Sequence, residues 1–123
     1  MHKQQLLLTI TPTTAHRIEI IGETVGRQAA VLSQETAFEL DTAAIDMLTW
    51  FLKAVKADEK VRHTFTEENW ILDYDPEYGP GDLEAFRLRR RATGRTISMA
   101  RPTAFKLLAA LLGETERLVE DEG

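Results

Sequence analysis

The sequence predicts an α+β fold made of two tandem units, each with several short strands followed by one helix. Two apolar segments show helical spacing, near residues 42–56 and 102–112, and short segments of alternating polar and apolar side chains precede both. The chain has 123 residues, 43% of them hydrophobic, so one domain can bury its own core. We therefore expect a single globular domain over residues 1–123, with antiparallel sheets of about three to four strands each.

Strand signals fill the first part of the chain. Leucine, isoleucine and threonine dominate residues 6–11, which end at Pro12, and residues 17–21 alternate polar and apolar side chains. Gly22 and Gly26 enclose polar residues and predict a hairpin connection. Two further strands and the turn between them complete the prediction: residues 29–32, 36–40 and 33–35.

The first helix is expected to begin at Asp41 or Thr42, because either side chain can accept a hydrogen bond from an unpaired amide of the first turn. Apolar residues at helical spacing continue to about residue 56. Three residues make the apolar face wider than a half-exposed helix requires: Met47, Trp50 and Phe51. This width predicts either burial between two layers or contact with a partner subunit.

The second half repeats the order of strands and helix. Four segments are expected to form strands: residues 61–65, 69–74, 86–91 and 96–99. Glycine and proline predict a long turn at 75–82 and a short one at 92–94. Pro102 suits the first turn of a second helix. That helix ends at Gly113, or it continues through Val119 while the acidic end of the tail 114–123 frays in solvent.

An internal repeat with units 5–57 and 61–113 is one interpretation of this order. An offset of 60 residues aligns Ala44–Leu48 with Ala104–Leu108 and Phe51–Leu52 with Leu111–Leu112. The aligned segments share few identical residues, and any two amphipathic helices can be aligned in this way. Duplication and two unrelated but similar units both remain open.

The order of several strands followed by one helix, present twice in the chain, resembles the Pur-alpha and Whirly group of single-stranded nucleic-acid-binding folds. The resemblance is carried by residues 96–99 leading into the helix at 102–112, and by residues 37–40 leading into the helix that starts near Thr42. In that group each unit has four strands and one helix, and basic and aromatic side chains of the sheet face bind the nucleic acid. The resemblance implies that role for Arg87, Arg89, Arg91 and Trp70. The net negative charge of this chain departs from the group's pattern.

The segment Leu83–Leu112 is strongly basic within an acidic protein. It contains seven basic residues and one acidic residue, a charge of +6 in a chain of net charge −5. Arg87, Arg89 and Arg91 fall on alternate positions of one predicted strand, so their side chains repeat every ~6.5 to 7 Å. This repeat is close to the spacing of phosphates in a nucleic-acid strand.

We therefore predict a non-catalytic binding module that holds single-stranded nucleic acid on an arginine-rich sheet face, with aromatic rings stacked on bases. The candidate contact residues are Arg87, Arg89, Arg91, Arg95, Arg101, Trp70 and Tyr74. Two other interpretations stay open. The arginines can pair with carboxylates on an ordinary surface, and both aromatic rings can belong to the core.

The alternative prediction is a protein-protein interaction module: a homodimer, a small chaperone or an inhibitor-type partner. The wide apolar face of the first helix favours it, and the basic patch would then meet an acidic surface on another protein or a second copy. Exposed aromatic rings beside arginines would favour nucleic acid, whereas a flat aliphatic patch would favour protein.

Composition limits the other classes of function. The chain has no cysteine, which excludes disulfides and thiolate metal sites and is typical of a cytoplasmic protein. No apolar run approaches the ~20 residues of a membrane span. Asp73, Asp75 and Glu77 match a calcium loop only in part, because Pro76 interrupts it. No catalytic motif or metal-ligand spacing is present, so we expect no enzyme activity, no cofactor and no metal.

Overall fold

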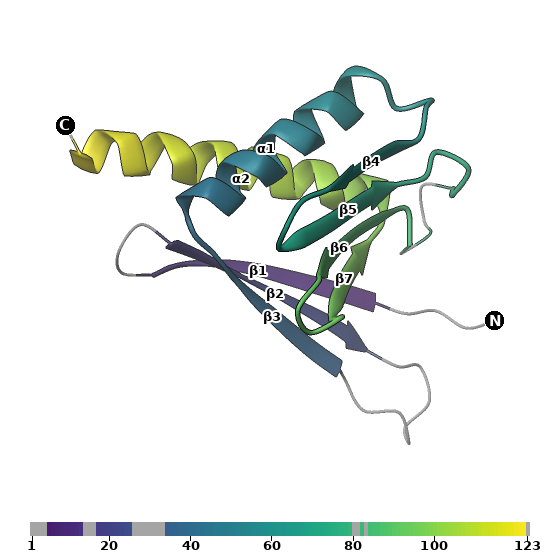
Figure 1. Ribbon diagram of the computed structural model, residues 1–123, viewed down its shortest axis with the longest axis horizontal. Helices are drawn as coiled ribbons and strands as arrows, with labels where there is room; N and C mark the ends of the chain where they lie inside the picture. Colours follow the sequence, from purple (N-terminus) through teal and green to yellow (C-terminus); the bar gives the residue numbers. More distant parts are fainter. Residues whose placement is uncertain (1–4, 14–16, 26–33, 80–81, 83, 123) are drawn as a thin grey trace.

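The computed structural model describes residues 5–13, 17–25, 34–79, 82 and 84–122. Within them the chain forms two antiparallel sheets, each followed by a helix (Figure 1). The first unit consists of β1 (Gln5–Thr13), β2 (Arg17–Val25), β3 (Gln34–Leu40) and α1 (Thr42–Ala57). The second consists of β4 (His63–Thr66), β5 (Trp70–Tyr74), β6 (Phe86–Arg90), β7 (Thr96–Met99) and α2 (Arg101–Glu122). This arrangement confirms the predicted α+β fold.

The first sheet has the order β1-β2-β3, with antiparallel pairing throughout. The predicted hairpin connection at Gly22 is wrong, because β2 runs through Gly22 to Val25. Gly22 pairs with Leu8 of β1 and Thr36 of β3. Its missing side chain lets Ile97 of the second sheet lie directly against the strand.

The ends of the neighbouring strands also differ from the prediction. β1 continues past Pro12 to Thr13, which is compatible with its position at the edge of the sheet. β3 begins at Gln34, so Gln34 and Glu35 belong to a strand instead of the predicted turn. The predicted strand at residues 29–32 lies outside the described residues.

Asp41 caps α1, since its Oδ1 accepts a hydrogen bond from the backbone N–H of Ala44 at 2.9 Å. Thr42, the other candidate cap, is the first helical residue. The wide apolar face of α1 is only partly covered: Phe51 is 2% exposed, whereas the neighbouring Trp50 is 57% exposed.

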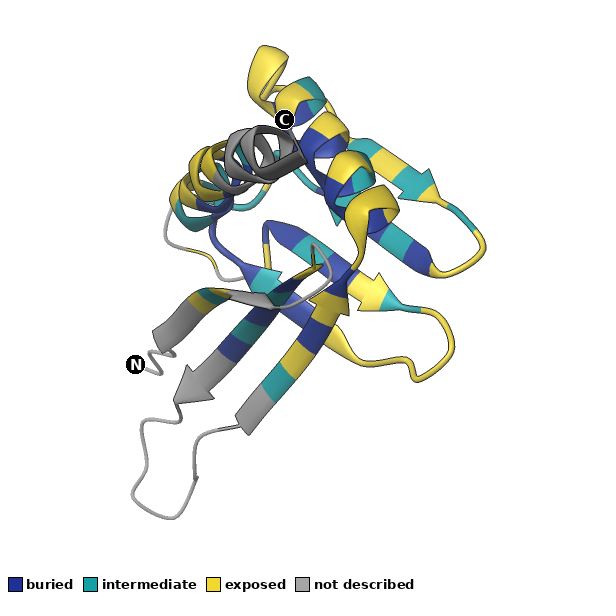
Figure 2. Ribbon diagram, turned by 90° about the vertical axis from the view of Figure 1, so that its left-hand side faces the viewer, coloured by how far each residue is buried: buried dark blue, intermediate teal, exposed yellow. Residues whose placement is uncertain are grey.

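The second sheet has the order β4-β5-β6-β7 and is also antiparallel. Buried residues alternate with more exposed ones along its strands, so the sheet has a buried inner face and an open outer face (Figure 2). The inner face carries Trp70, Leu72, Tyr74, Phe86, Leu88, Ile97 and Met99. This confirms that Trp70, Leu72 and Tyr74 share one face.

α2 begins at Arg101, and Pro102 lies in its first turn, where the missing N–H costs no helix hydrogen bond. The helix continues through Gly113 to Glu122, so the predicted end at Gly113 is wrong and the longer alternative is observed. α1 and α2 pack against each other, and their apolar faces form one core with both sheets. In the described part of the chain, no helix is long and apolar enough to cross a membrane.

Candidate functional site

The outer face of the second sheet presents two rows of side chains that cross all four strands. Cross-strand neighbours form the first row, Thr64, Asp73, Arg87 and Ser98, and the second row, Thr66, Ile71, Arg89 and Thr96. Both rows line a groove of about 540 Å³, together with Arg62 and Glu84. Arg87 and Arg89 of β6 therefore lie inside the face, and hydroxyl groups of β4 and β7 lie at its two edges.

Asp73 is held between two arginines of this groove. Its Oδ2 accepts a hydrogen bond from Nη2 of Arg87 at 2.7 Å, and its Oδ1 accepts one from Nε of Arg62 at 3.2 Å. The hydrogen bond between Arg62 and Asp73, together with the negative charge of Asp73, raises the pKa of Arg62 above its ordinary value. The carboxylate of Asp73 thus offsets part of the positive charge on the outer face.

Arg89 is the exposed cation of the second row. Within the described residues no carboxylate forms an ion pair with it. Its guanidinium lies near the turn between β6 and β7, because a Cβ placed on Gly94 would be 3.7 Å from Nη2 of Arg89. Gly94 has a φ of +71°, a conformation that suits glycine in this turn. Arg89 is therefore available to an anion from outside the protein.

Arg91 does not extend the row of Arg87 and Arg89. β6 ends at Arg90, and the Arg91 side chain turns back to donate a hydrogen bond from Nη1 to the backbone carbonyl of Glu67 at 2.8 Å. Arg95 is exposed in the connection between β6 and β7. The predicted row of three arginines is thus a row of two, with Arg91 and Arg95 beyond the strand.

Trp70, Tyr74 and Arg101 lie on the other side of the sheet. Trp70 is 4% exposed, and Tyr74 is fully buried with its hydroxyl donating to the carbonyl of Glu59 at 2.9 Å. Arg101, at the start of α2, donates from Nη2 to the carbonyl of Tyr78 at 2.9 Å. The structure therefore separates these three residues from the outer face, and both rings belong to the core, where no base can stack on them.

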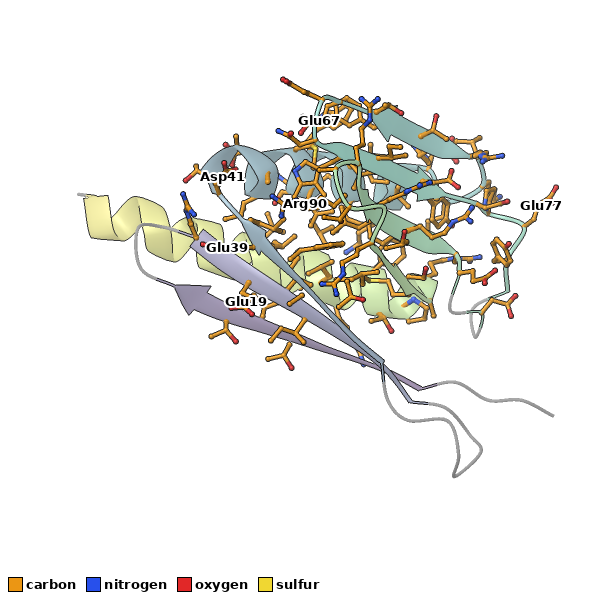
Figure 3. The ribbon with its side chains drawn as sticks, turned by 60° about the horizontal axis from the view of Figure 1, so that its bottom comes forward. Glu19, Glu39, Asp41, Glu67, Glu77 and Arg90 are labelled. Carbon is orange, nitrogen blue, oxygen red and sulfur yellow. The ribbon has the colours of Figure 1, made fainter. Side chains whose placement is uncertain are left out.

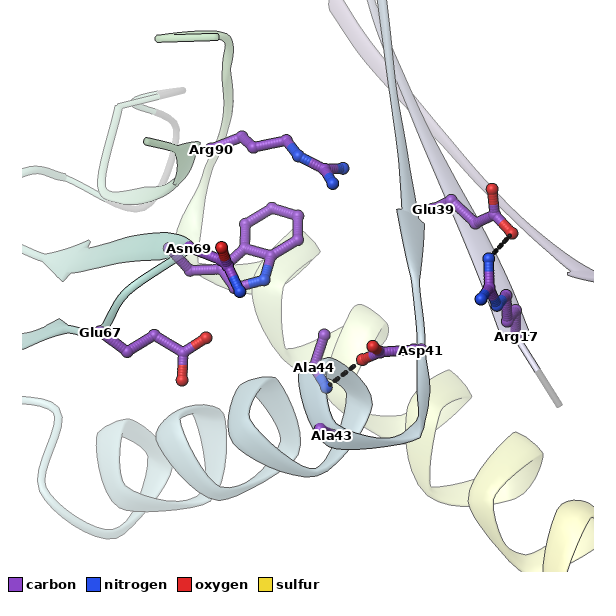
Figure 4. Close-up of a pocket in the computed structure, with 9 residues that line it drawn as sticks. Arg17, Glu39, Asp41, Ala43, Ala44, Glu67, Asn69 and Arg90 are labelled. Atoms are coloured by element: carbon purple, nitrogen blue, oxygen red, sulfur yellow. Dashed lines mark hydrogen bonds and ion pairs between the residues drawn. The ribbon is translucent and has the colours of Figure 1, made fainter. Parts of the chain in front are cut away.

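A second hollow of about 370 Å³ lies where α1 begins, between the two sheets (Figure 4). Arg90 lies over the indole of Trp70, 5.2 Å from the ring centroid, and Arg17 contacts Glu39 at 3.1 Å. Asp41, which caps α1, also lines the hollow. Most charged groups here already have partners within the chain, so this hollow is a weaker candidate for binding than the outer face.

Four charged residues that line the second hollow, Glu39, Asp41, Glu67 and Arg90, are labelled in Figure 3, and Glu77 lies away from them at the other end of the molecule. Glu67 lines that hollow, and its backbone also holds the β4–β5 turn through a hydrogen bond from its N–H to the carbonyl of Trp70 at 2.9 Å.

Arg62 and the hydroxyl residues of the outer face were not singled out by the sequence. Thr64, Thr96 and Ser98 lie in predicted strands and Thr66 directly follows one, and alternation along these strands is the only local signal for a shared face. Strand order and register decide that these positions flank Arg87 and Arg89, and neither can be obtained from one short strand.

No group of three or more histidine, aspartate or glutamate side chains in the described chain could hold a metal ion. Comparisons with protein-family models, curated proteins and solved structures return no match to this chain. The resemblance to the Pur-alpha and Whirly group therefore stays a prediction.

Proposed function

We propose that this protein is a non-catalytic binding module that holds the backbone of single-stranded nucleic acid on the outer face of the second sheet. The observation that carries the proposal is Arg89, an exposed arginine without an ion-pair partner in the described chain, inside a groove of about 540 Å³. Arg87 lies two residues away on the same strand and faces the same groove.

The groups around these arginines suit phosphates. Arginine binds phosphate through a planar fork of N–H donors, and serine and threonine hydroxyls are common phosphate contacts. Four hydroxyl residues line the groove: Thr64, Thr66, Thr96 and Ser98. The side chains of Arg87 and Arg89 are separated by ~6.5 to 7 Å along the strand, which allows them to contact successive phosphates.

The same face offers little that could read bases. No aromatic side chain lines the groove in the described structure, and Ile71 and Leu72 are its only apolar lining residues. We therefore expect binding without sequence preference, dominated by charge. Because Asp73 offsets one of the three charges of Arg62, Arg87 and Arg89, the groove neutralises about two phosphates, and log K falls against log salt concentration with a slope of about −1.4.

Fluorescence anisotropy with a labelled oligothymidylate, recorded over a salt series, tests the proposal. Arg89→Glu should weaken binding about tenfold or more at low salt and reduce the slope, because it removes one phosphate contact and adds repulsion. Lys53→Glu is the matched control, since it makes the same charge change on an exposed position of α1. It should change affinity much less than Arg89→Glu.

Three results would contradict the proposal. The first is an equal loss of affinity in Arg89→Glu and Lys53→Glu, which would indicate that binding depends on net charge alone. The second is an affinity that does not change with salt concentration. The third is absence of binding by the unchanged protein. Binding of an acidic protein to the Arg89 face in place of the oligonucleotide would support the alternative function as an interaction module.

A further inference from the structure

Arg90 is a half-buried cation in the second hollow. Phe86 and Leu88 face the core from alternate positions of β6, and Arg90 is the next residue on that side of the strand. Its guanidinium lies over the indole of Trp70, 5.2 Å from the ring centroid. In the described chain no carboxylate forms an ion pair with it. Stacking on a ring leaves the N–H groups at the edge of a guanidinium uncovered, so Arg90 offers a fork of donors to a carboxylate.

Glu67 brings the opposite charge to the same hollow. It lies in the connection between β4 and β5, is half-buried, and has no ion-pair partner among the residues that the structure describes. Figure 4 shows Arg90 and Glu67 on one side of the hollow and the Arg17–Glu39 pair on the other. Arg90 and Glu67 thus line one hollow without pairing with each other. A ligand that carries both charges would satisfy both groups.

The backbone around both side chains is fixed by hydrogen bonds. The carbonyl of Glu67 accepts a hydrogen bond from Nη1 of Arg91 at 2.8 Å, and the N–H of Glu67 donates to the carbonyl of Trp70 at 2.9 Å. The N–H of Arg90 donates to the carbonyl of Arg95 at 2.9 Å. The two charged groups therefore start from anchored positions, which lowers the entropy cost of binding a ligand between them.

The charge of the lining distinguishes between classes of ligand. Two arginines and three carboxylates line the hollow, which gives it a net charge of −1. A plain anion such as phosphate would meet this negative field, whereas a ligand with one positive and one negative group would not. The volume of about 370 Å³ lies at the lower end of the range for small-molecule sites. The hollow therefore suits a small zwitterion.

We propose that the second hollow binds a small amino carboxylate, whose carboxylate is held by Arg90 and whose ammonium group is held by Glu67. Trp70, Ala43 and Ala44 supply the apolar part of the lining, which would contact the methylene groups between the two charges. Charge-assisted hydrogen bonds at both ends give the site its selectivity for a ligand that carries both groups.

This site is separate from the proposed nucleic-acid site. The groove around Arg89 lies on the outer face of the second sheet, and it shares no lining residue with the second hollow. Binding of an amino carboxylate does not require binding of nucleic acid, so either proposal can fail without the other.

Isothermal titration calorimetry of the unchanged protein tests the proposal. The probes are unbranched amino carboxylates from glycine to ε-aminohexanoate, which differ in the distance between their charges. We expect one chain length to bind best, with a dissociation constant in the millimolar range or below, because Arg90 and Glu67 are anchored. The alkyl carboxylate and the alkylamine of that length should each bind about tenfold more weakly or less, since each meets only one charge. Equal affinity of the carboxylate alone, or no heat of binding with any probe, would overturn the proposal.

Neutral variants assign the two contacts. Glu67→Gln should weaken binding of the best probe about fivefold or more, whereas Glu68→Gln, the same change at an exposed position outside the hollow, should leave it within about twofold. Arg90→Gln should weaken binding about tenfold or more, and Lys53→Gln on the exposed side of α1 is its control. Equal losses within either pair, while far-UV circular dichroism shows folded protein, would reject the assigned contacts. If Arg90→Gln does not fold, the Glu67 pair and the single-charge probes decide the proposal.

Discussion

Gly22 of β2 lies against the side chain of Ile97 of β7, which brings the two sheets into contact. A Cβ placed on Gly22 would be 3.0 Å from Cγ2 and 3.2 Å from Cγ1 of Ile97. Ile97 is 2% exposed and branched at Cβ, so its side chain has little freedom to move away. The absence of a side chain at position 22 is thus what allows the strands of the two units to approach.

Gly22→Ala should therefore destabilise the protein, by about 1 kcal/mol net. Overpacking a core site costs about 1–3 kcal/mol, and the reduced entropy of the unfolded chain returns about 0.4–1 kcal/mol. Chemical denaturation measures the difference. Gly113→Ala is the matched control: nothing lies within 4 Å of the added methyl group, and alanine should stabilise the interior of α2 by up to about 1 kcal/mol. Equal effects of the two changes would contradict the assigned contact.

Asp41→Ala should lower the free energy of unfolding by about 1 kcal/mol, because the Ala44 N–H loses its hydrogen-bond acceptor at the start of α1. Asp46→Ala removes the same group from an exposed position inside the helix, where it caps nothing. It should change the free energy of unfolding by less than about 0.5 kcal/mol. Urea denaturation of both variants makes the comparison, and a larger loss in Asp46→Ala would count against the cap.

Tyr74 should make the fold sensitive to alkali. Burial raises the pKa of its hydroxyl above the usual value of 10.0. The unfolded chain therefore releases this proton at a lower pH than the folded chain does. The stability that it contributes is fully present below about pH 10 and is lost as the pH rises toward the folded pKa.

Tyr74→Phe should reduce that alkaline loss, which unfolding measurements between neutral pH and about pH 11 would detect. At neutral pH the variant should be less stable by about 1 kcal/mol, because the carbonyl of Glu59 loses its donor. Tyr78→Phe is the control, since that hydroxyl is exposed and donates only a 3.3 Å hydrogen bond to Glu84. An unchanged pH profile in Tyr74→Phe would disprove the role of Tyr74.

Asp73→Asn should strengthen binding of single-stranded nucleic acid severalfold while lowering stability. In the unchanged protein the carboxylate of Asp73 neutralises part of the charge of Arg62 and Arg87, and the substitution removes this carboxylate. Both guanidinium groups then become available to phosphates, and the salt dependence of binding should steepen. Anisotropy titrations over a salt series would measure both effects.

Glu84→Gln is the control for Asp73→Asn. Glu84 also lines the groove and loses the same charge, but it forms no ion pair in the described structure. A gain in affinity of equal size in both variants would mean that net charge, and not release of the arginines, governs binding.

The distribution of arginines shows how far local patterns reach. Alternation along one strand correctly placed Arg87 and Arg89 on one face and Leu88 on the other. The same reasoning extended the row to Arg91, which lies beyond the strand with its side chain bonded to the carbonyl of Glu67. Where a strand ends depends on the length of its partner. The backbone N–H of Arg91 donates a hydrogen bond to the carbonyl of Asn69, which already precedes β5.

Local sequence patterns predicted that strands precede one helix in each unit, that Asp41 or Thr42 caps α1, and that Trp70, Leu72 and Tyr74 share one face. These features follow from side-chain periodicity and capping chemistry, which act within a few residues. Three features could not be predicted: Gly22 lies inside a strand, Asp73 lies between Arg62 and Arg87, and Trp50 is exposed. Those features depend on register and on the packing of two units, because they join residues that are distant in the chain.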